Sequence, residues 1–407
     1  MIMADLQIHS RYARACSTQI NIENLEKWGR IKGIDLLGTA DFQHPLWNKE
    51  IKEKLTEDDF GILRTKTGFP FLWQTEISLM YSDNGRRAVH LLVYSPNKEV
   101  SDQIIDVLGK RGRLDYDGRP IFGISCPEFT EIMMQINKDI EIIPAHCMTP
   151  WFGLFGSKSG FNSIKDCFKD QTKHIHAVET GMSADPSMLW RLEENVNLVS
   201  FSDAHSFWPW RLGRECTVFD TELKYKEILN AIRTGQGLKE TIEVNPEYGK
   251  YHFDGHRDCN VSFSPEETRK LNKICPVCKK ELTIGVEYRI EELAKHEFGY
   301  KPKNAKQFKS LIPLSELISV VYGKSLTSKS IWEIYNKLIA RFGNEFNILL
   351  NANEKNLIDI IDKKLVNLIL LNREGKLKIK PGYDGVYGQI ILNQNETLQR
   401  QKSLNEF

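Results

Sequence analysis

Histidines and acidic residues of the kind that bind divalent metal ions recur along the first half of the sequence. Asp5, Gln7 and His9 alternate within one short apolar segment, so a strand would place all three on one face. A buried face that is polar at every position is costly, and bound metal ions are the simplest explanation for it. A single histidine at a strand end is more often structural, so this motif gains weight only together with others.

Further ligand-type residues follow the same pattern: Asp41, Glu76, His90, His146, Asp203 and His205. Mixed imidazole and carboxylate ligands suit Zn²⁺, Mn²⁺ or Fe²⁺ better than Mg²⁺, which prefers oxygen. Two or three such ions close together can bind a phosphate, lower the pKa of a bound water and stabilise a leaving oxygen. The predicted cofactor is therefore a divalent metal cluster, and the predicted chemistry is hydrolysis of phosphate esters.

Short apolar strands and amphipathic helices alternate over the first 205 residues and must position these ligands. The expected strands are 3–9, 35–40, 71–77, 88–95, 141–146, 175–180 and 197–202, and the expected helices include 22–32, 101–109, 127–136 and 186–194. Such repeats imply a parallel sheet, and about seven strands with no obvious antiparallel pair favour a closed α/β barrel. Reactive groups in barrels lie at the C-terminal strand ends, where six of the seven expected strands carry a ligand-type residue. Only His90 lies early in its strand.

A second candidate metal site lies further along the chain. His256, Cys259, Cys275 and Cys278 form two closely spaced pairs separated by fifteen residues, a spacing typical of structural zinc. His252 is the alternative fourth ligand. Four protein ligands leave no open position, so this zinc is expected to be structural. Thiols stay reduced in the cytosol, which favours a metal over disulfides.

Charge is unevenly distributed although the net charge is only +1. Residues 1–245 carry 29 basic and 34 acidic side chains, whereas residues 246–345 carry 17 and 13. Residues 295–330 alone hold seven lysines and two acidic residues. A positive C-terminal part suits a polyanion such as DNA, although an ordinary solvated surface is the alternative.

No apolar run approaches the roughly 20 residues needed to span a bilayer, and the first residues lack the features of a signal peptide. We therefore expect a cytoplasmic, nucleoid-associated protein without membrane contact.

Five residues are candidates for contacts to DNA or to an extruded base: Arg11, Arg14, Trp151, Phe152 and Tyr383. Arginines after the first strand could contact phosphate, and exposed aromatic rings could stack on a base. Surface salt bridging and packing as a lid are the corresponding structural alternatives. Trp208 and Trp210 are weaker candidates of the same kind.

The ordered motifs at 5–10, 38–41, 76, 90, 145–146 and 203–205 resemble those of polymerase-and-histidinol-phosphatase (PHP) phosphoesterases. Longer stretches are similar to the endonuclease Q family, nucleases that act on deaminated bases. These stretches are 9–12, 37–42, 143–146, 178–186, 211–215, 250–257 and 381–388. The resemblance runs from residue 4 to about residue 392.

The resemblance implies a distorted (β/α)7 PHP barrel with a trinuclear metal site. One ion would be held by His9, Glu76 and Asp203. A second would be held by Glu76, His90 and His146, with Glu76 bridging, and Asp41 and His205 would contribute to a third. The catalytic residues would be His9, Glu76, Asp203 and Glu179. Glu179 could be a ligand or a hydrogen-bonding group, and the second role is favoured.

Gln7 is the one clear departure, because the family pattern has His-x-His where this chain has Gln7-Ile8-His9. An amide oxygen is a weak ligand for Zn²⁺ or Fe²⁺, so occupancy of one site and full activity are in question. His44 is open between ligand and hydrogen-bonding neighbour. His174 and His176 are expected on the outer face, opposite Glu179.

The predicted function is a DNA repair endonuclease that hydrolyses the phosphodiester 5′ of uracil, hypoxanthine, xanthine or an abasic site, using metal-activated water. The alternatives are a PHP-type phosphatase or exonuclease, which the basic C-terminal part disfavours, and a DNA-binding protein with a metal site weakened at Gln7. The expected domains are a catalytic barrel at 1–245, a zinc module at 246–300, a helical DNA-binding domain at 301–393 and a disordered tail at 394–407. Metal identity, lesion preference, oligomeric state and any sliding-clamp contact stay open.

Overall fold

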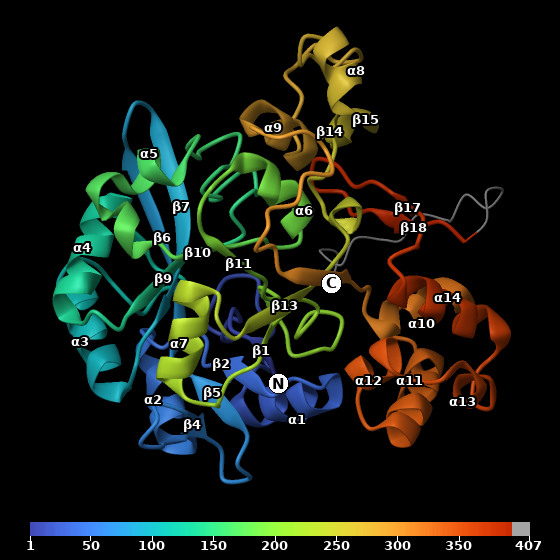
Figure 1. The fold of residues 1–407 in the computed structure, drawn as a ribbon, viewed down its shortest axis with the longest axis horizontal. Helices are drawn as coiled ribbons and strands as arrows, with labels where there is room; N and C mark the ends of the chain where they lie inside the picture. Colours follow the sequence, from blue (N-terminus) through green and yellow to red (C-terminus); the bar gives the residue numbers. More distant parts are fainter. Residues whose placement is uncertain (393–407) are drawn as a thin grey trace.

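The computed structural model describes residues 1–392, and the tail expected at 394–407 lies outside that range. Strands and helices are interleaved in the N-terminal part, a small module projects from it, and helices dominate the C-terminal part (Figure 1). The predicted mixed α/β class is confirmed. Among the residues described, no helix has the length and apolar character needed to cross a membrane.

The largest sheet has eight strands in the order β16-β13-β12-β1-β2-β5-β4-β3. Its strands are β1 (Ile2–Asp5), β2 (Leu36–Gly38), β3 (Thr56–Glu57), β4 (Leu63–Arg64), β5 (Pro70–Leu72), β12 (Cys216–Phe219), β13 (Leu238–Glu243) and β16 (Gln307–Ser310). Strands β1, β2 and β5 are parallel, as expected, whereas β12 runs antiparallel to β1.

A second sheet has the order β8-β6-β7-β9. Its strands are β8 (Ile121–Phe122), β6 (Gln74–Ser82), β7 (Arg86–Tyr94) and β9 (Glu141–Pro144). The strands β6 and β7 form a long antiparallel hairpin, and β9 is antiparallel to β7. The expectation that no strand pair here is antiparallel was therefore wrong. The turn at Asp83, Asn84 and Gly85 reverses the chain, with Gly85 at a φ of 120° that favours glycine.

Strands β10 (Ala177–Glu179) and β11 (Asn197–Val199) form a third, parallel pair. Within residues 1–392 the ladders are separate, and single backbone contacts link them. Ile8 bridges to Ala204, and the N–H of Cys147 donates to the carbonyl of Glu179 at 2.9 Å. These links hold the strand ends that carry the ligand-type residues next to one another.

The helices α1 (Ile22–Lys32), α3 (Lys98–Gly109) and α4 (Cys126–Ile136) lie close to their predicted positions, and α7 (Tyr225–Thr234) follows later in the chain. The expected helix at 186–194 is shorter: α6 (Pro186–Leu189) is followed by a 3-10 turn, Trp190–Leu192. The other helices of this part are α2 (Pro45–Lys54) and α5 (Ile164–Phe168), with a 3-10 turn at Lys169–His174. Asparagine and serine side chains begin several of these helices; Asn21 accepts a hydrogen bond from the N–H of Asn24 at 2.7 Å.

The projecting module contains β14 (Asp254–His256), β15 (Val261–Phe263), α8 (Pro265–Lys270) and α9 (Val286–Leu293) (Figure 1). Short 3-10 turns at Pro246–Tyr248 and Arg257–Cys259 precede and interrupt it. The C-terminal helices are α10 (Leu314–Tyr322), α11 (Lys329–Phe342), α12 (Glu345–Leu350), α13 (Glu354–Ile358) and α14 (Lys363–Arg373). They are followed by the paired strands β17 (Ile379–Lys380) and β18 (Gln389–Ile390).

The basic segment 302–313 contributes β16 to the main sheet, parallel to β13. The C-terminal helices also pack on the N-terminal part. Lys32 on α1 donates to buried Glu345 at 2.7 Å, and Trp332 on α11 contacts Trp28 and Trp208. Trp210 stacks on Trp208 in the same cluster, so these two indoles pack between helices rather than facing a base.

Candidate metal centre

Glu76 lies at the centre of the convergent ligand-type residues. Its side chain is fully buried, and its Oε1 lies 2.7 Å from His90 Nδ1 and 3.5 Å from His146 Nε2. Its Oε2 lies 3.0 Å from His9 Nε2. Each oxygen of one carboxylate therefore faces a different set of imidazoles, as a ligand shared between two ions requires.

Two groups of three residues have ligand atoms within 4.8 Å of one another. The first contains Glu76, His90 and His146, and the second contains His9, Asp203 and His205. His9 Nε2 is 3.2 Å from Asp203 Oδ1, and the rings of His9 and His205 are 4.7 Å apart. The structure thus brings together six of the eight residues predicted as ligands.

Asp41 and Gln7 lie beside these groups. Asp41 Oδ1 is 3.0 Å from His9 Nδ1, and Asp41 Oδ2 accepts from the N–H of Ser10 at 2.7 Å. Gln7 donates from Nε2 to Glu76 Oε2 at 2.9 Å, and its Oε1 is buried without a hydrogen-bond partner among the described residues. In this structure Asp41 acts on the ring of His9, and Gln7 acts on Glu76.

Antiparallel pairing accounts for the position of His90. It lies in the middle of β7, opposite Ser78 on β6, and two residues from the level of Glu76. Because β7 runs against β6, a ligand in mid-strand reaches the same end of the site as ligands at the ends of parallel strands. Its place early in the expected strand 88–95 is therefore consistent with the cluster.

Three non-glycine residues at the site have left-handed backbone conformations. The φ angles are 62° for Ala40, 30° for His146 and 47° for Asp203. Such conformations are uncommon outside glycine and cluster at functional sites, where the surrounding structure imposes them. Here they turn the chain sharply at the ends of β2, β9 and β11, so that the ligand-type side chains enter the cluster.

Burial and neighbouring charges set the protonation of these groups. Burial favours the neutral form of Glu76, but Arg119 and His90 outweigh it and hold the pKa of Glu76 well below its usual range. Burial lowers the pKa of His90 to about 3. A charged carboxylate next to a neutral imidazole is the state in which both donate lone pairs to a cation.

The residues present fit divalent metal ions. Gln7 Oε1 is buried and has no hydrogen-bond partner among the described residues. His9 Nε2 lies 3.0 Å from Glu76 Oε2 and 3.2 Å from Asp203 Oδ1, so lone-pair atoms of three residues lie close together here. Buried polar atoms without partners are costly, and cations between them would remove that cost. The nitrogen and oxygen ligand set suits Zn²⁺, Mn²⁺ or Fe²⁺.

Glu179 lies behind His146 rather than among the ligand atoms. Its Oε2 accepts from the backbone N–H of His146 at 2.6 Å. Burial raises the pKa of Glu179 well above its usual range, and the charges of Asp203 and Glu76 raise it further. This geometry agrees with a hydrogen-bonding role that fixes the backbone of His146.

Asp5 and His44 lie outside the two groups of ligand-type residues. Asp5 accepts from Ser202 and from the N–H of Gly213 at 2.8 Å, so it does not share the metal-facing side with Gln7 and His9 as strand alternation predicted. The reason is that β1 ends at Asp5 and the chain no longer alternates beyond it. The ring of His44 stacks on Tyr12 at 4.3 Å.

Arg119 is a charged residue of the site that the sequence did not reveal. Its Nη1 lies 3.3 Å from Glu76 Oε1. It belongs to a loop between α3 and β8 whose sequence, Gly118-Arg119-Pro120, resembles an ordinary turn. No spacing relative to the ligand motifs distinguishes it, so only the fold could place it here.

The candidate DNA-contacting residues have diverse surroundings. Arg11 forms an ion pair with Glu50 and donates to the carbonyl of Ile20 at 2.8 Å, which is the predicted structural alternative. Arg14 is exposed. Trp151 is 40% exposed, which leaves part of its ring available to a partner.

Two aromatic residues proposed to stack on a base, Phe152 and Tyr383, are not exposed. Phe152 is half-buried and stacks on His90 at 4.4 Å, so it orients a ligand-type ring. Tyr383 is buried, and its Oη donates to Asn260 Oδ1 at 2.9 Å. A Cβ at Gly255 would lie 2.5 Å from the ring of Tyr383, so the ring packs closely against this strand. Both rings are held by packing, which is the structural alternative to stacking on a base.

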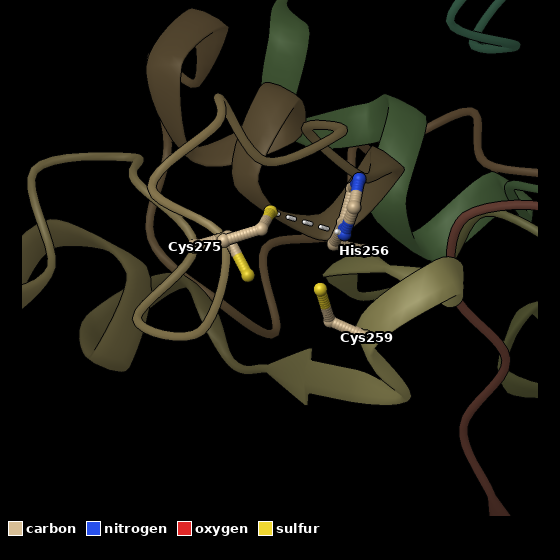
Figure 2. A group of neighbouring side chains, drawn as sticks. His256, Cys259 and Cys275 are labelled. Atoms are coloured by element: carbon tan, nitrogen blue, oxygen red, sulfur yellow. Dashed lines mark hydrogen bonds between the residues drawn. The ribbon is translucent and has the colours of Figure 1, made fainter.

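The cysteine cluster forms a compact four-residue group in the projecting module (Figure 2). His256, Cys259, Cys275 and Cys278 have ligand atoms within 4.8 Å of one another, and Cys278 Sγ is 3.6 Å from His256 Nδ1. Three sulfurs and one imidazole facing a common centre fit a tetrahedral Zn²⁺. His252, the alternative ligand, is buried and lies outside this group.

The chain is similar to one protein family and to two uncharacterized proteins. The family described as the MJ0043 C-terminal domain matches residues 313–376. The uncharacterized protein MJ0043 of Methanocaldococcus jannaschii is 35% identical over 256 residues, which cover 60% of this chain but only 31% of that protein. The uncharacterized protein YqxK of Bacillus subtilis is 28% identical over 377 residues, covering 88% of this chain and 89% of that protein.

Two solved structures are similar over essentially the whole chain. One is the lesion-specific endonuclease PfuEndoQ of Pyrococcus furiosus, with a TM-score of 0.86, 29% identity, and coverage of 100% of this chain and 99% of that one. The other is endonuclease Q in complex with a 27-mer duplex that carries an abasic lesion at the active site, with a TM-score of 0.86, 29% identity and 98% coverage of both chains. The predicted resemblance to endonuclease Q is confirmed.

Proposed function

We propose that this chain, which resembles endonuclease Q along its full length, is a metal-dependent endonuclease that nicks DNA on the 5′ side of a deaminated base or an abasic site. The observation that carries the proposal is the convergence of His9, His90 and His146 on the buried carboxylate of Glu76. The similarity of the fold to a nuclease bound to lesion-containing DNA supports DNA as the substrate.

The cluster supplies the ligands that phosphodiester hydrolysis needs. Divalent ions bound there would polarise the phosphate and lower the pKa of an attacking water. The chain's own residues hold the imidazoles in place: Asp41 contacts His9 Nδ1, Phe152 stacks on His90, and Glu179 fixes the backbone of His146. Ligands whose orientation is fixed by neighbours bind metal more tightly.

We further propose the domain division 1–245, 246–300 and 301–393, with the first part as a distorted PHP barrel. The sheet and strand-end links between β1, β2, β6, β7, β9, β10 and β11 support a ring of strands around the cluster. In this proposal the zinc module and the positively charged helical part contact the DNA backbone. Trp151 is the exposed aromatic residue nearest in sequence to the cluster that could contact an unstacked base.

A lesion-panel assay tests the function directly. The full chain is incubated with Mg²⁺ or Mn²⁺ and end-labelled duplexes that differ only in one residue: uracil, hypoxanthine, xanthine, an abasic site or the normal base. We expect a single nick 5′ of the lesion and no cleavage of the normal duplex. Cleavage from DNA ends, or turnover of a chromogenic phosphate ester without lesion preference, would instead establish the phosphatase or exonuclease alternative.

A further inference from the structure

The loop between α3 and β8 places the guanidinium of Arg119 beside Glu76, in the group of ligand-type residues. Arg119 Nη1 lies 3.3 Å from Glu76 Oε1, and the Arg119 side chain is 24% exposed while Glu76 is fully buried. Arginine stays charged at any physiological pH. A partly exposed cation therefore lies beside the buried carboxylate of Glu76.

The backbone on both sides of Arg119 is fixed. Gly118 donates from its N–H to the carbonyl of Tyr12 at 3.1 Å, and Gln43 Nε2 donates to the carbonyl of Gly118 at 2.6 Å. The carbonyl of Pro120 accepts from the N–H of Ser78 on β6 at 3.0 Å. Bonds to three separate segments hold this loop, so the base of the guanidinium is positioned before any substrate arrives.

Gly118 lets the loop approach the cluster this closely. A Cβ at this position would lie 2.3 Å from Asp41 Oδ2 and 2.8 Å from the Cβ of Ala13. Cβ atoms essentially never approach other atoms this closely, so any other residue would require the loop, Ala13 or the Asp41 side chain to shift. The close approach of the backbone serves the placement of the arginine.

Arg119 has donors to spare. A guanidinium carries five N–H groups, and the hydrogen bond of this side chain within residues 1–392 goes to one oxygen of Glu76 from one nitrogen. Arginine–carboxylate pairs frequently use two parallel bonds, whereas this pair uses one nitrogen and one oxygen. The single contact leaves the rest of the planar donor set for another group of complementary geometry.

The charges around Arg119 indicate which group its remaining N–H donors would bind. The carboxylates of Asp41, Glu76 and Asp203 surround the site, and divalent ions would offset them. A phosphodiester adds another negative charge, and its two nonbridging oxygens match the spacing of guanidinium donors. We propose that Arg119 and the cluster form the binding site for the scissile phosphate, with Arg119 donating to its nonbridging oxygens. This inference rests on the proposed function.

The alternative is that Arg119 is a positioning residue that acts only through Glu76. The two roles give different readouts. A positioning residue, when removed, disturbs Glu76 and lowers the amount of metal bound. A phosphate-binding residue, when removed, weakens binding of phosphate while the metal content of the cluster stays unchanged.

The test compares Arg119→Gln and Arg119→Lys with the full wild-type chain after loading with Mn²⁺. Arg113→Gln is the matched control, because Arg113 belongs to the same loop region, is 75% exposed and pairs with Asp115. Three quantities are measured: bound metal by elemental analysis, affinity for inorganic phosphate by calorimetry, and kcat and KM on an abasic duplex. Thermal unfolding checks that each variant is folded.

We expect Arg119→Gln to weaken phosphate binding at least tenfold and to lower kcat/KM about 100-fold, with the metal content of wild type. Arg119→Lys keeps the charge but loses the planar donor pair, so its phosphate affinity and kcat/KM should lie between those of wild type and Arg119→Gln. Arg113→Gln should match wild type. Unchanged phosphate affinity in Arg119→Gln, or loss of metal from it, would overturn the proposal.

The outcome separates this proposal from the proposed function. If the wild type binds phosphate through Arg119 but nicks none of the lesion duplexes, the proposed substrate is wrong and the phosphate site stands. If Arg119→Gln nicks lesion DNA as fast as wild type, the function stands and the phosphate site is wrong.

Discussion

Two buried carboxyl groups in the N-terminal part, Glu76 on β6 and Glu243 on β13, have very different neighbours. Both side chains are fully buried. Around Glu76 lie three imidazoles and the Arg119 guanidinium, and these cations and donors hold the pKa of Glu76 well below its usual range against the effect of burial.

Glu243 is surrounded by hydroxyl groups instead. Its Oε2 accepts from Thr180 at 2.8 Å and from Ser200 at 2.9 Å, and its Oε1 accepts from Thr241 at 2.5 Å. Burial raises the pKa of Glu243 to about 8, because these hydroxyls offset only part of the desolvation. Glu215 nearby is also buried, and burial together with the charge of Glu243 raises its pKa well above the usual range.

The contrast shows that residue type and burial do not define a metal ligand. A carboxylate that stays charged between imidazoles presents lone pairs to a cation, whereas a carboxyl that stays protonated among hydroxyls is a neutral link in a hydrogen-bond network. We therefore propose that Glu76 serves the chemistry of the site and that Glu243 serves the stability of the sheet.

The largest expected effect is on Glu76. The substitution Glu76→Gln keeps the size of the side chain but removes the charge and one of the two ligand oxygens. We expect cleavage of lesion DNA to fall at least about 10³-fold, because a carboxylate shared between two ions is lost. Nicking assays and elemental analysis measure the activity and the metal bound in the cluster.

Glu131→Gln is the control for this variant, because Glu131 lies exposed on α4. It should behave as wild type in both assays. Full activity of Glu76→Gln with normal metal content would show that Glu76 is not a required metal ligand.

Glu243 should control stability rather than activity, and in a pH-dependent way. Its pKa of about 8 in the folded state exceeds the ordinary value of 4.5. The folded state therefore binds more protons than the unfolded state between these values, and the free energy of unfolding falls as the pH rises from about 4.5 to 8. The loss is on the order of 4 kcal/mol over that window.

The variant Glu243→Gln resembles the protonated carboxyl but cannot ionise. We expect it to match the wild-type free energy of unfolding near pH 5 and to exceed it near pH 8, as measured by denaturant unfolding at both values. Glu240→Gln, on the same strand and paired with Lys309, should not change the slope with pH. Equal slopes for wild type and Glu243→Gln would show that Glu243 ionises normally.

The sequence singled out ligand-type residues because they stand among apolar residues near the expected strand ends, and the structure brings six of them together although Glu76 and His90 lie inside longer strands. His9, Glu76, His90, His146, Asp203 and His205 all lie in the two clusters. Spacing alone singled out Cys259, Cys275 and Cys278, since a local motif needs no knowledge of the fold, and the structure places His256 rather than His252 with them.

The errors have a common physical origin in strand direction and tertiary packing. The hairpin of β6 and β7 was expected as parallel strands, because a strand's own pattern does not encode the direction of its neighbour. For Tyr383 and Phe152 the sequence left exposure and packing open, and only the fold shows their rings held by Gly255 and by His90. Arg119 was missed because a loop that is distant in sequence brings it to Glu76.

The smallest effect on metal affinity and nicking rate is expected from substitution of Gln7, which contacts Glu76. Gln7 Nε2 donates to Glu76 Oε2 and so occupies a lone pair that a cation would otherwise use, while Gln7 Oε1 has no partner among the described residues. An imidazole is a stronger ligand than an amide oxygen. We expect Gln7→His to raise metal affinity and the rate of nicking about tenfold.

Gln7→Asn is the control, because it keeps the amide but shortens the side chain and should not gain metal. Metal titrations followed by nicking assays on the same preparations separate affinity from rate. If the wild type holds zinc at the cysteine cluster alone and does not nick, while Gln7→His gains both metal and cleavage, then this chain is a DNA-binding protein whose metal site is weakened at Gln7. If Gln7→His gains neither, the amide is not what limits the site, because Glu76, His9 and Asp203 already provide the contacts that matter.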